Sequence, residues 1–168
     1  DLDAPDRVIV SACRSLARAT GARGMAGGQA IDIAAVGSAL TQAELESMHA
    51  MKTGALICAA AEIGVALGGR PDCPEFREAI GVFSASLGLS FQVIDDVLDA
   101  TADSVTLGKT AGKDQAQDKP TFIRLLGLDQ SRAYAQQLLD RALASIEPLG
   151  PPADRLRALA LALTHRAH

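Results

Sequence analysis

Apolar residues recur at helical spacing along most of the chain. The first such set falls at Val8, Ile9, Ala12, Leu16 and Ala19. Positions three and four apart share one face of a helix, so this pattern predicts a helix over residues 6–20. Asp6 is expected to cap the start of this helix, and Gly21 to end it.

Two longer helices are predicted in the middle of the chain. Thr41, with Glu44 three residues later, has the pattern of a capping box, and the apolar spacing that follows continues to Gly68. Pro74 is well placed to begin a second long helix, which reaches Asp99. A polar stretch follows over residues 101–118. After it we expect helices over 119–126, 129–146 and 153–165.

Composition supports an all-α fold with one core. The 168 residues are 48% apolar but only 3% aromatic, so the core must be built from Ala, Leu, Ile and Val. Dominance of Ala and Leu favours helix. We find no alternating pattern typical of a hairpin. The length is that of a single domain.

Charge and cysteine content exclude several classes of protein. The net charge is −4 and no long basic run occurs, so nucleic acid is not expected as a partner. The three cysteines (Cys13, Cys58 and Cys73) form no metal-ligand pattern and suit a reducing cytosol. The longest apolar run, residues 55–61, is too short to span a bilayer, so we expect no membrane insertion.

Three carboxylates interrupt the apolar pattern of the second long helix. Asp95, Asp96 and Asp99 lie within Phe91-Gln92-Val93-Ile94-Asp95-Asp96-Val97-Leu98-Asp99. Asp95 and Asp99 stack one turn apart on a helix, with Asp96 beside them. Buried carboxylates need a partner, and Mg²⁺ with its preference for oxygen ligands is the natural one. The alternative is a solvated acidic turn at a helix end.

Several lysines could complement these acids. Lys52 and Thr53 precede an apolar run, where Lys52 either binds phosphate or extends from the rim of the core into water. Lys109 and Lys113 each follow a glycine in the polar stretch. They could hold the far side of a polyphosphate whose metal is held by the acids. The alternative for both is a solvated, charged loop.

A glycine-rich segment precedes the first long helix. Gly27 and Gly28 allow close approach of a neighbour, and we favour helix packing over ligand contact as their role. Gln29 and Asp32 lie three residues apart on one face and could orient a buried partner. The segment has no GxGxxG pattern, so it predicts no dinucleotide site.

Taken together, these motifs resemble a known family. They are Gly28-Gln29-Ala30-Ile31-Asp32, Lys52-Thr53-Gly54, the aspartate stretch, Leu107-Gly108-Lys109, Gly112-Lys113-Asp114 and Lys119-Pro120-Thr121. Their order and spacing are similar to those of the C-terminal half of trans-polyprenyl diphosphate synthases, closest to the bacterial farnesyl diphosphate synthase type. The resemblance covers essentially all of residues 1–168.

The resemblance implies a fold and a reaction. The fold is an antiparallel helix bundle of the isoprenoid synthase type, here its C-terminal part, in a cytoplasmic homodimer. The enzyme is a prenyltransferase that joins dimethylallyl or geranyl diphosphate to isopentenyl diphosphate and releases pyrophosphate, assisted by three Mg²⁺ ions. Metals and lysines offset the charge that develops on the leaving group.

The resemblance also assigns roles to individual residues. Asp95 would bind metal directly, and Asp96 and Asp99 mainly through metal-bound waters. Lys52 and Lys109 would hold the allylic diphosphate, with Lys119 as a weaker candidate. Thr53 and Gln92 would face the reacting carbons.

Two features depart from the family pattern. Asp118 stands where the family usually has Gly, and its carboxylate could hold Lys119. The family's first aspartate-rich motif, which lies on a facing helix, is missing before Asp95. We therefore expect these 168 residues alone to be inactive, and the native enzyme to carry further helices upstream.

The alternatives are a terpene cyclase of related fold and a non-catalytic partner subunit of a prenyl synthase.

Overall fold

A computed structural model describes residues 4–68, 73–106 and 118–164, and within these ranges the regular elements are all helical. The α-helices are α1 (Asp6–Thr20), α2 (Met25–Ala34), α3 (Gln42–His49), α4 (Ala55–Leu67), α5 (Pro74–Thr106), α6 (Phe122–Leu126), α7 (Leu128–Ile146) and α8 (Asp154–Thr164). A π-helical turn, η1 (Ala50–Gly54), joins α3 to α4, and two short 3₁₀ turns, η2 (Glu147–Leu149) and η3 (Pro151–Ala153), join α7 to α8.

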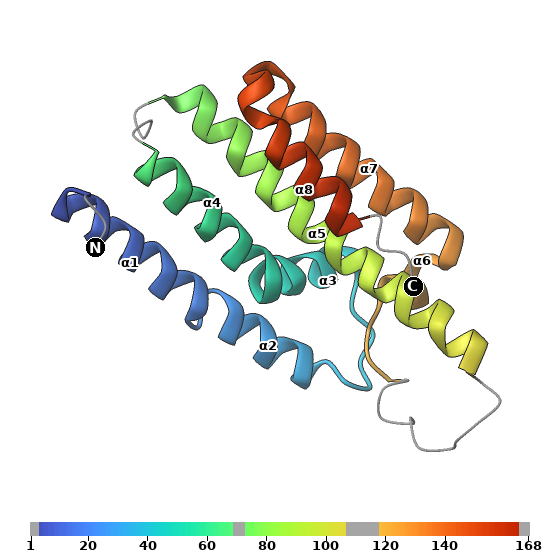
Figure 1. Cartoon of the computed structure of the whole chain (residues 1–168). Coiled ribbons are helices and arrows are strands. Elements are labelled where there is room, and N and C mark those ends of the chain that lie inside the picture. The colour runs from blue at the N-terminus through green and yellow to red at the C-terminus, as the bar shows by residue number, and fades with distance from the viewer. Residues whose placement is uncertain (1–3, 69–72, 107–117, 165–168) are drawn as a thin grey trace.

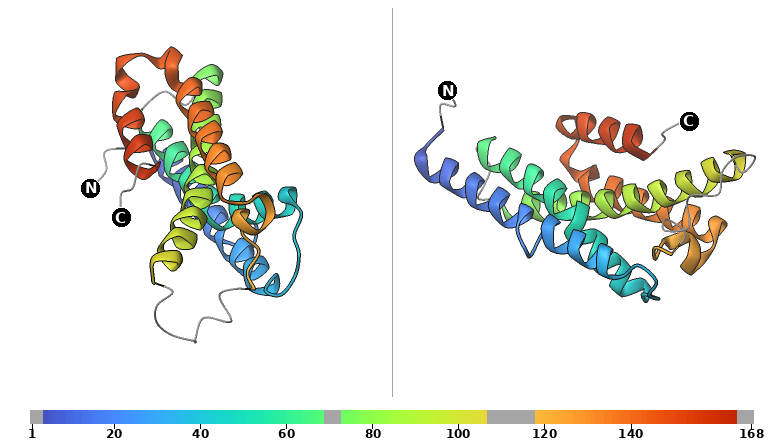
Figure 2. Two further views of the ribbon diagram at one scale, coloured as in Figure 1. Left: turned by 90° about the vertical axis from the view of Figure 1, so that its right-hand side faces the viewer. Right: turned by 90° about the horizontal axis from the view of Figure 1, so that it is seen from below.

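The long helices α1, α4, α5 and α7 lie side by side, and each runs antiparallel to the next (Figure 1). Helix α1 packs beside α4, α4 beside α5, and α5 beside α7, with α8 against both α5 and α7. Figure 2 shows α1 and α2 following one another along one side of this bundle. The predicted antiparallel helix bundle is therefore the arrangement observed.

The helix ends agree with the sequence in most places but differ in others. The short helix predicted over residues 119–126 begins only at Phe122. Thr41 and Glu44 form the predicted capping box, and Gly21 ends α1. Asp6 is the first residue of α1 rather than its cap, a position taken by Pro5. Gly127, not Asp129, precedes α7. Helix α5 continues to Thr106, beyond its predicted end at Asp99.

The apolar core has two parts. The first lies between α5, α7 and α8 and is formed by Ile80, Phe83, Leu87, Leu139, Ala142, Ile146, Ala153 and Ala160. The second lies where α3, α5, α6 and α7 meet and is formed by Leu45, Met48, Val93, Phe122, Ala135 and Leu138. The predicted aspartates lie next to the second part of the core, because Val93 belongs to that part and Asp95 follows it two residues later in the same helix.

Two helical stretches, 42–67 and 74–101, are long and apolar enough to cross a membrane by length and composition alone. Core helices of soluble proteins pass the same test, and half of the apolar window in 74–101 is buried within the bundle. In the other stretch 11% of the window is buried. The absence of membrane insertion therefore stays a prediction.

Candidate active site

The π-helical turn η1 carries Lys52 and Thr53 and is held from both sides by glycines. A Cβ atom on Gly28 of α2 would lie 2.3 Å from the backbone nitrogen of Lys52. On the opposite side, a Cβ on Gly88 of α5 would lie 3.1 Å from Cα of Gly54. A side chain at Gly28 would therefore force the backbone of η1 to move, and one at Gly88 would fit only after a small shift of its neighbour. The sequence predicted one uninterrupted helix here, and π-turns are frequent at functional sites.

Asp32 joins the two predicted diphosphate-binding lysines of the described residues. Its side chain is buried, and Oδ2 lies 2.7 Å from Nζ of Lys52 and 3.5 Å from Nζ of Lys119. Burial alone would raise the pKa of Asp32. Hydrogen bonds and charge from Lys52, with a smaller contribution from Lys119, outweigh burial and hold the pKa below its usual value. The result is a carboxylate that fixes two ammonium groups close together.

The sequence suggested that the adjacent carboxylate of Asp118 could hold Lys119, but the structure places Asp118 against a different side chain. The carboxylate of Asp118 lies 3.8 Å from Arg124 instead, and both of these side chains are exposed. Lys119 is free to reach across to Asp32 on α2, 87 residues earlier in the chain. The departure at position 118 therefore leaves Lys119 within the site.

Gln92 connects the η1 turn to the aspartates. Its Oε1 accepts a hydrogen bond from Oγ1 of Thr53 at 2.9 Å, and its Nε2 donates to Oδ2 of Asp95 at 3.2 Å. His49 also lies against Oε1, with Nδ1 at 3.0 Å. A continuous network therefore runs from Thr53, next to Lys52, to Asp95.

Asp96 faces the start of α6. Its Oδ2 accepts a 2.7 Å hydrogen bond from the backbone nitrogen of Phe122. Burial raises the pKa of Asp96 to about 6, helped by the charges of Asp99, Asp95 and Asp32 and opposed by the bond from Phe122. This carboxyl group therefore sits in a region where negative charge is already concentrated.

The other predicted site residues are either more exposed or lie outside the described part of the chain. Asp99 is exposed on the next turn of α5. Lys109 and Lys113 lie outside the described residues. Within the described part of the chain, no three His, Cys, Asp or Glu side chains converge closely enough to hold a metal ion by themselves.

Sequence reasoning missed two participants and left a third undefined. His49 and Phe122 received no role, although a histidine three residues before Lys52 shares its helix face and could have been noticed. Asp32 was expected to orient a buried partner, but the partner was not identified. Its two lysines come from segments 20 and 87 residues away, which no local pattern reveals.

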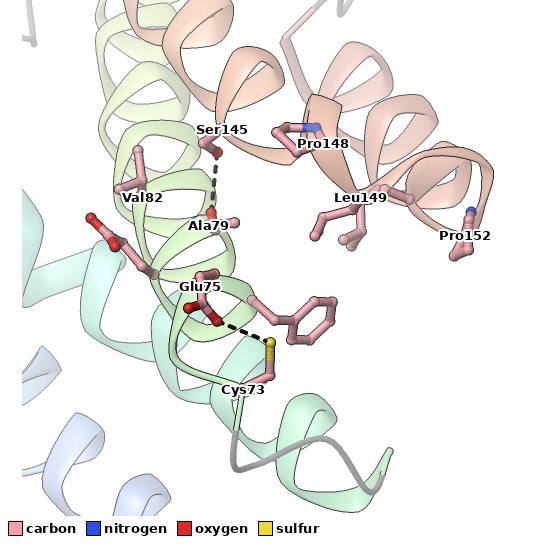
Figure 3. A pocket seen from close by; sticks show the side chains of 12 residues that line it. Cys73, Glu75, Ala79, Val82, Ser145, Pro148, Leu149 and Pro152 are labelled. Atoms are coloured by element: carbon pink, nitrogen blue, oxygen red, sulfur yellow. Dashed lines mark hydrogen bonds between the residues drawn. The ribbon is translucent and has the colours of Figure 1, made fainter.

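A large cavity lies elsewhere in the described part of the chain. It has a volume of about 770 Å³ and opens between the start of α5, the end of α7 and the η2–η3 turns (Figure 3). Apolar side chains such as Val82 and Leu149 dominate its lining, and Glu75 lies at its edge beside Cys73. Val82 and Asp95 are separated by 13 residues of helix, or about 20 Å. This cavity is therefore not part of the aspartate site.

Comparison with known proteins gives consistent results. The family described as Polyprenyl synthetase matches residues 9–148. A Sinorhizobium fredii (strain NBRC 101917 / NGR234) protein named "Probable farnesyl diphosphate synthase" is 45% identical over 157 residues, covering 92% of this chain and 47% of the relative. Farnesyl diphosphate synthase of Escherichia coli (strain K12) is 43% identical over 155 residues, covering 89% of this chain and 50% of that protein.

Solved structures agree in fold. Geranyltransferase from Helicobacter pylori, complexed with magnesium and isoprenyl diphosphate, aligns with a TM-score of 0.76 at 33% identity over 95% of this chain and 52% of that one. Geranyltransferase from Legionella pneumophila aligns with a TM-score of 0.82 at 27% identity, covering 98% of this chain and 52% of that one. These matches confirm the predicted all-α fold, and this chain spans about half the length of the relatives it matches. With a family match over residues 9–148 and relatives above 40% identity, the chain belongs to the polyprenyl synthetase family.

Proposed function

We propose that the complete protein is a short-chain trans-prenyl diphosphate synthase. It joins the allylic group of dimethylallyl or geranyl diphosphate to isopentenyl diphosphate, releases pyrophosphate and a proton, and forms farnesyl or a related diphosphate. Relatives named farnesyl diphosphate synthase support this reaction. The family match also favours a transferase over the terpene cyclase alternative.

One observation carries the proposal. Two ammonium groups, on Lys52 and Lys119, are fixed at Asp32, while Thr53 next to Lys52 is linked through Gln92 to Asp95. Cations and carboxylates thus flank one region from different helices. A diphosphate leaving group needs both: ammonium groups contact its oxygens, and carboxylates hold the divalent cations that offset its charge.

The donor set fits Mg²⁺. The aspartates offer oxygen ligands only, and the charges of Asp99, Asp95 and Asp32 add to burial in raising the pKa of Asp96. A divalent ion would offset these charges, and three Mg²⁺ are expected in the complete enzyme. Asp95 would bind metal directly, with Asp96 and Asp99 acting through bound waters. The Helicobacter pylori geranyltransferase complex with magnesium supports this choice of ion.

The remaining roles follow the charges. Lys52, Lys119 and Lys109 would hold the allylic diphosphate, and Asp32 keeps the first two in place until it arrives. Thr53 and Gln92 present oxygen atoms that would steady positive charge on the reacting carbons. The neighbouring apolar residues, Val93 among them, would keep water away from that charge.

We also propose that residues 1–168 form the C-terminal part of a single helical domain and do not turn over alone. The described aspartates make one wall, which holds no metal by itself. The relatives are about twice as long. A second set of carboxylates on the other half would complete the site, in a cytoplasmic homodimer.

A chimera tests the proposal. This chain is joined to the half of Escherichia coli farnesyl diphosphate synthase that it does not match. With Mg²⁺, geranyl diphosphate and isopentenyl diphosphate, the chimera should release pyrophosphate and form farnesyl diphosphate, whereas the isolated chain should not. Omission of isopentenyl diphosphate should abolish product formation. A cyclase would not require isopentenyl diphosphate.

Matched variants identify the residues. Asp95→Ala in the chimera should abolish most activity, because a metal ligand is lost. Asp140→Ala removes an exposed carboxylate on α7 that contacts Gln136, and should leave activity unchanged. A folded chimera without activity would contradict the proposed reaction. Product formation by the isolated chain would contradict its proposed inactivity.

A further inference from the structure

His49 is the last residue of α3 and lies directly behind the η1 turn. Its side chain is 7% exposed, in a helix whose other polar residues mostly face water. Nδ1 lies 3.0 Å from Oε1 of Gln92, while Nε2 is buried and has no hydrogen-bond partner. A buried histidine with one partnered nitrogen needs a physical explanation.

The orientation of Gln92 determines which nitrogen of His49 carries the proton. Asp95 can only accept hydrogen bonds when ionised, so the Gln92 amide must point its NH₂ group toward that carboxylate. Oε1 then points toward Thr53 and His49, and both must donate to it. The proton of the neutral ring is therefore on Nδ1, and Nε2 carries a lone pair.

The unpartnered nitrogen agrees with this assignment. A proton on Nε2 would leave a buried donor without an acceptor, which is costly, whereas a bare lone pair is tolerated more easily. Burial also lowers the pKa of His49, with a smaller contribution from the charge of Lys52. It outweighs the hydrogen bond to Gln92 and the charge of Asp32, which both raise the pKa. The ring is therefore neutral at pH 7.

The ring is also anchored to the second carboxylate of the site. It stacks on Phe122, with centroids 5.6 Å apart and planes inclined by 24°. Phe122 is fully buried, and its backbone nitrogen donates to Asp96. One layer, formed by His49 and Phe122, thus lies behind both Asp95 and Asp96.

We propose that His49 is a positioning residue: as a neutral Nδ1–H donor it fixes the amide of Gln92 so that the NH₂ group faces Asp95. The assignment rests on the proposed function for its consequence, namely the arrangement of Asp95 toward metal and diphosphate. Partners behind a metal ligand typically affect metal affinity by about tenfold or more.

Two substitutions separate hydrogen bonding from packing. Asparagine places its Nδ2 the same number of bonds from the backbone as Nδ1 of histidine, so His49→Asn keeps the donor. Leucine has nearly the same shape as asparagine but no donor. Both variants lose the same stacking on Phe122, so a difference between them reports the hydrogen bond to Gln92.

The first experiment reads the proton directly on the wild-type chain. Long-range ¹H–¹⁵N spectra with [¹⁵N]histidine distinguish the two tautomers, and His49→Asn identifies the signals of His49 among the three histidines. We expect a neutral ring with the proton on Nδ1 at pH 7. A proton on Nε2, or a cationic ring, would overturn the proposal whether or not the variants fold.

The second experiment follows Gln92 and ligand affinity in the variants. The side-chain NH₂ signals of Gln92, assigned by their loss in Gln92→Glu, should stay in place in His49→Asn and move in His49→Leu. Affinity for pyrophosphate with Mg²⁺, measured by titration calorimetry on the chimera that carries each variant, should fall about tenfold with His49→Leu. It should stay within about threefold in His49→Asn, which keeps the bond.

The outcomes distinguish this inference from the proposed function. Equal changes in both variants would overturn the inference, because lost packing would then explain them. A chimera that binds no pyrophosphate in the presence of Mg²⁺ would count against the proposed function. The tautomer and the Gln92 signals require no ligand, so they decide the role of His49 in either case.

Discussion

The two halves of α5 perform different tasks on the same helix. The first half buries Ile80, Phe83 and Leu87 against α7 and α8. The second half buries Ser90 and Gln92 and carries Asp95 and Asp96. In the first half, packing is the main source of stability, whereas the second half must hold charge and polar atoms in place.

The difference shows how the site is supported. In and around the second half, polar groups are placed by one another. Gln92 contacts Thr53 and His49, and Asp96 accepts a hydrogen bond from the backbone of Phe122. Asp32, on the neighbouring helix α2, contacts two lysines. Glycines replace side chains where backbones meet. Such an arrangement positions charge accurately but contributes less stability than the aliphatic half.

The largest expected effect comes from filling a glycine contact. Gly28→Ala places a methyl group against the backbone of Lys52, so α2 and η1 must separate, at a cost of about 3 kcal/mol. Gly81→Ala in the first half of α5 meets nothing within 4 Å and should stabilise by about 1 kcal/mol. Urea unfolding of both variants measures these values. Equal effects of the two substitutions would show that the close crossing is not required.

The second prediction concerns the carboxylate shared by two lysines. Asp32→Asn leaves Lys52 and Lys119 without their counter-charge, which should cost about 2 kcal/mol, between the values for exposed and buried ion pairs. Because the folded-state pKa of Asp32 is lowered, its contribution is present above the unfolded value near 3.8 and is lost as pH falls below it. Unfolding free energies from pH 7 to pH 3 test this.

Lys119→Met is the matched control for Asp32. Its Nζ lies farther from Asp32, at 3.5 Å, and 45% of its side chain is exposed. The substitution should therefore cost less than about 1 kcal/mol. A Lys119→Met variant as unstable as Asp32→Asn would show that the long contact, rather than the contact with Lys52, dominates.

The third prediction concerns Asp96, whose contribution to stability depends on pH in the direction opposite to that of Asp32. The pKa of Asp96 is raised from 3.8 to about 6, so the folded chain binds this proton more tightly than the unfolded chain. The stability of the metal-free protein should therefore fall as pH rises from about 4 to about 6. Asp96→Asn keeps an acceptor for Phe122 without the charge, and should stabilise the chain by about 1–2 kcal/mol at pH 7.

Asp99→Asn provides the comparison, because Asp99 is exposed on the same helix. It should change stability little at any pH. The advantage of Asp96→Asn should vanish below about pH 4, where both proteins carry an uncharged group. A constant advantage at every pH would show that charge is not its cause. In the chimera, Asp96→Asn should also weaken the binding of Mg²⁺ and pyrophosphate.

The sequence predicted several helix ends correctly. The capping box at Thr41, the end of α1 at Gly21 and the start of α5 at Pro74 were read from local chemistry, and the structure confirms them. The placement of Gly28 at a close helix contact is also confirmed. These features depend on a few neighbouring residues, which is why one sequence is enough to find them.

What the sequence could not predict depends on residues far apart in the chain. The π-turn at η1 has no local signature, and it lies against Gly28 and Gly88 of two neighbouring helices. The partners of Asp32 and the pairing of Asp96 with Phe122 arise only when the helices assemble. Helix α5 also extends past Asp99 to Thr106, although the mostly polar residues 101–106 did not predict a continuing helix.

The smallest expected effect compares two serines of α5 that are almost completely buried. Ser90 donates to the carbonyl of Ala135 on α7, whereas Ser84 donates to Ile80 within its own helix. Ser90→Ala removes a bond between helices and should cost about 1 kcal/mol. Ser84→Ala removes only a local bond and gains helix propensity, so it should be neutral within about 0.5 kcal/mol. Urea unfolding resolves this difference, and a cost for Ser84→Ala equal to that for Ser90→Ala would mean that polar contacts stabilise both halves of α5 alike.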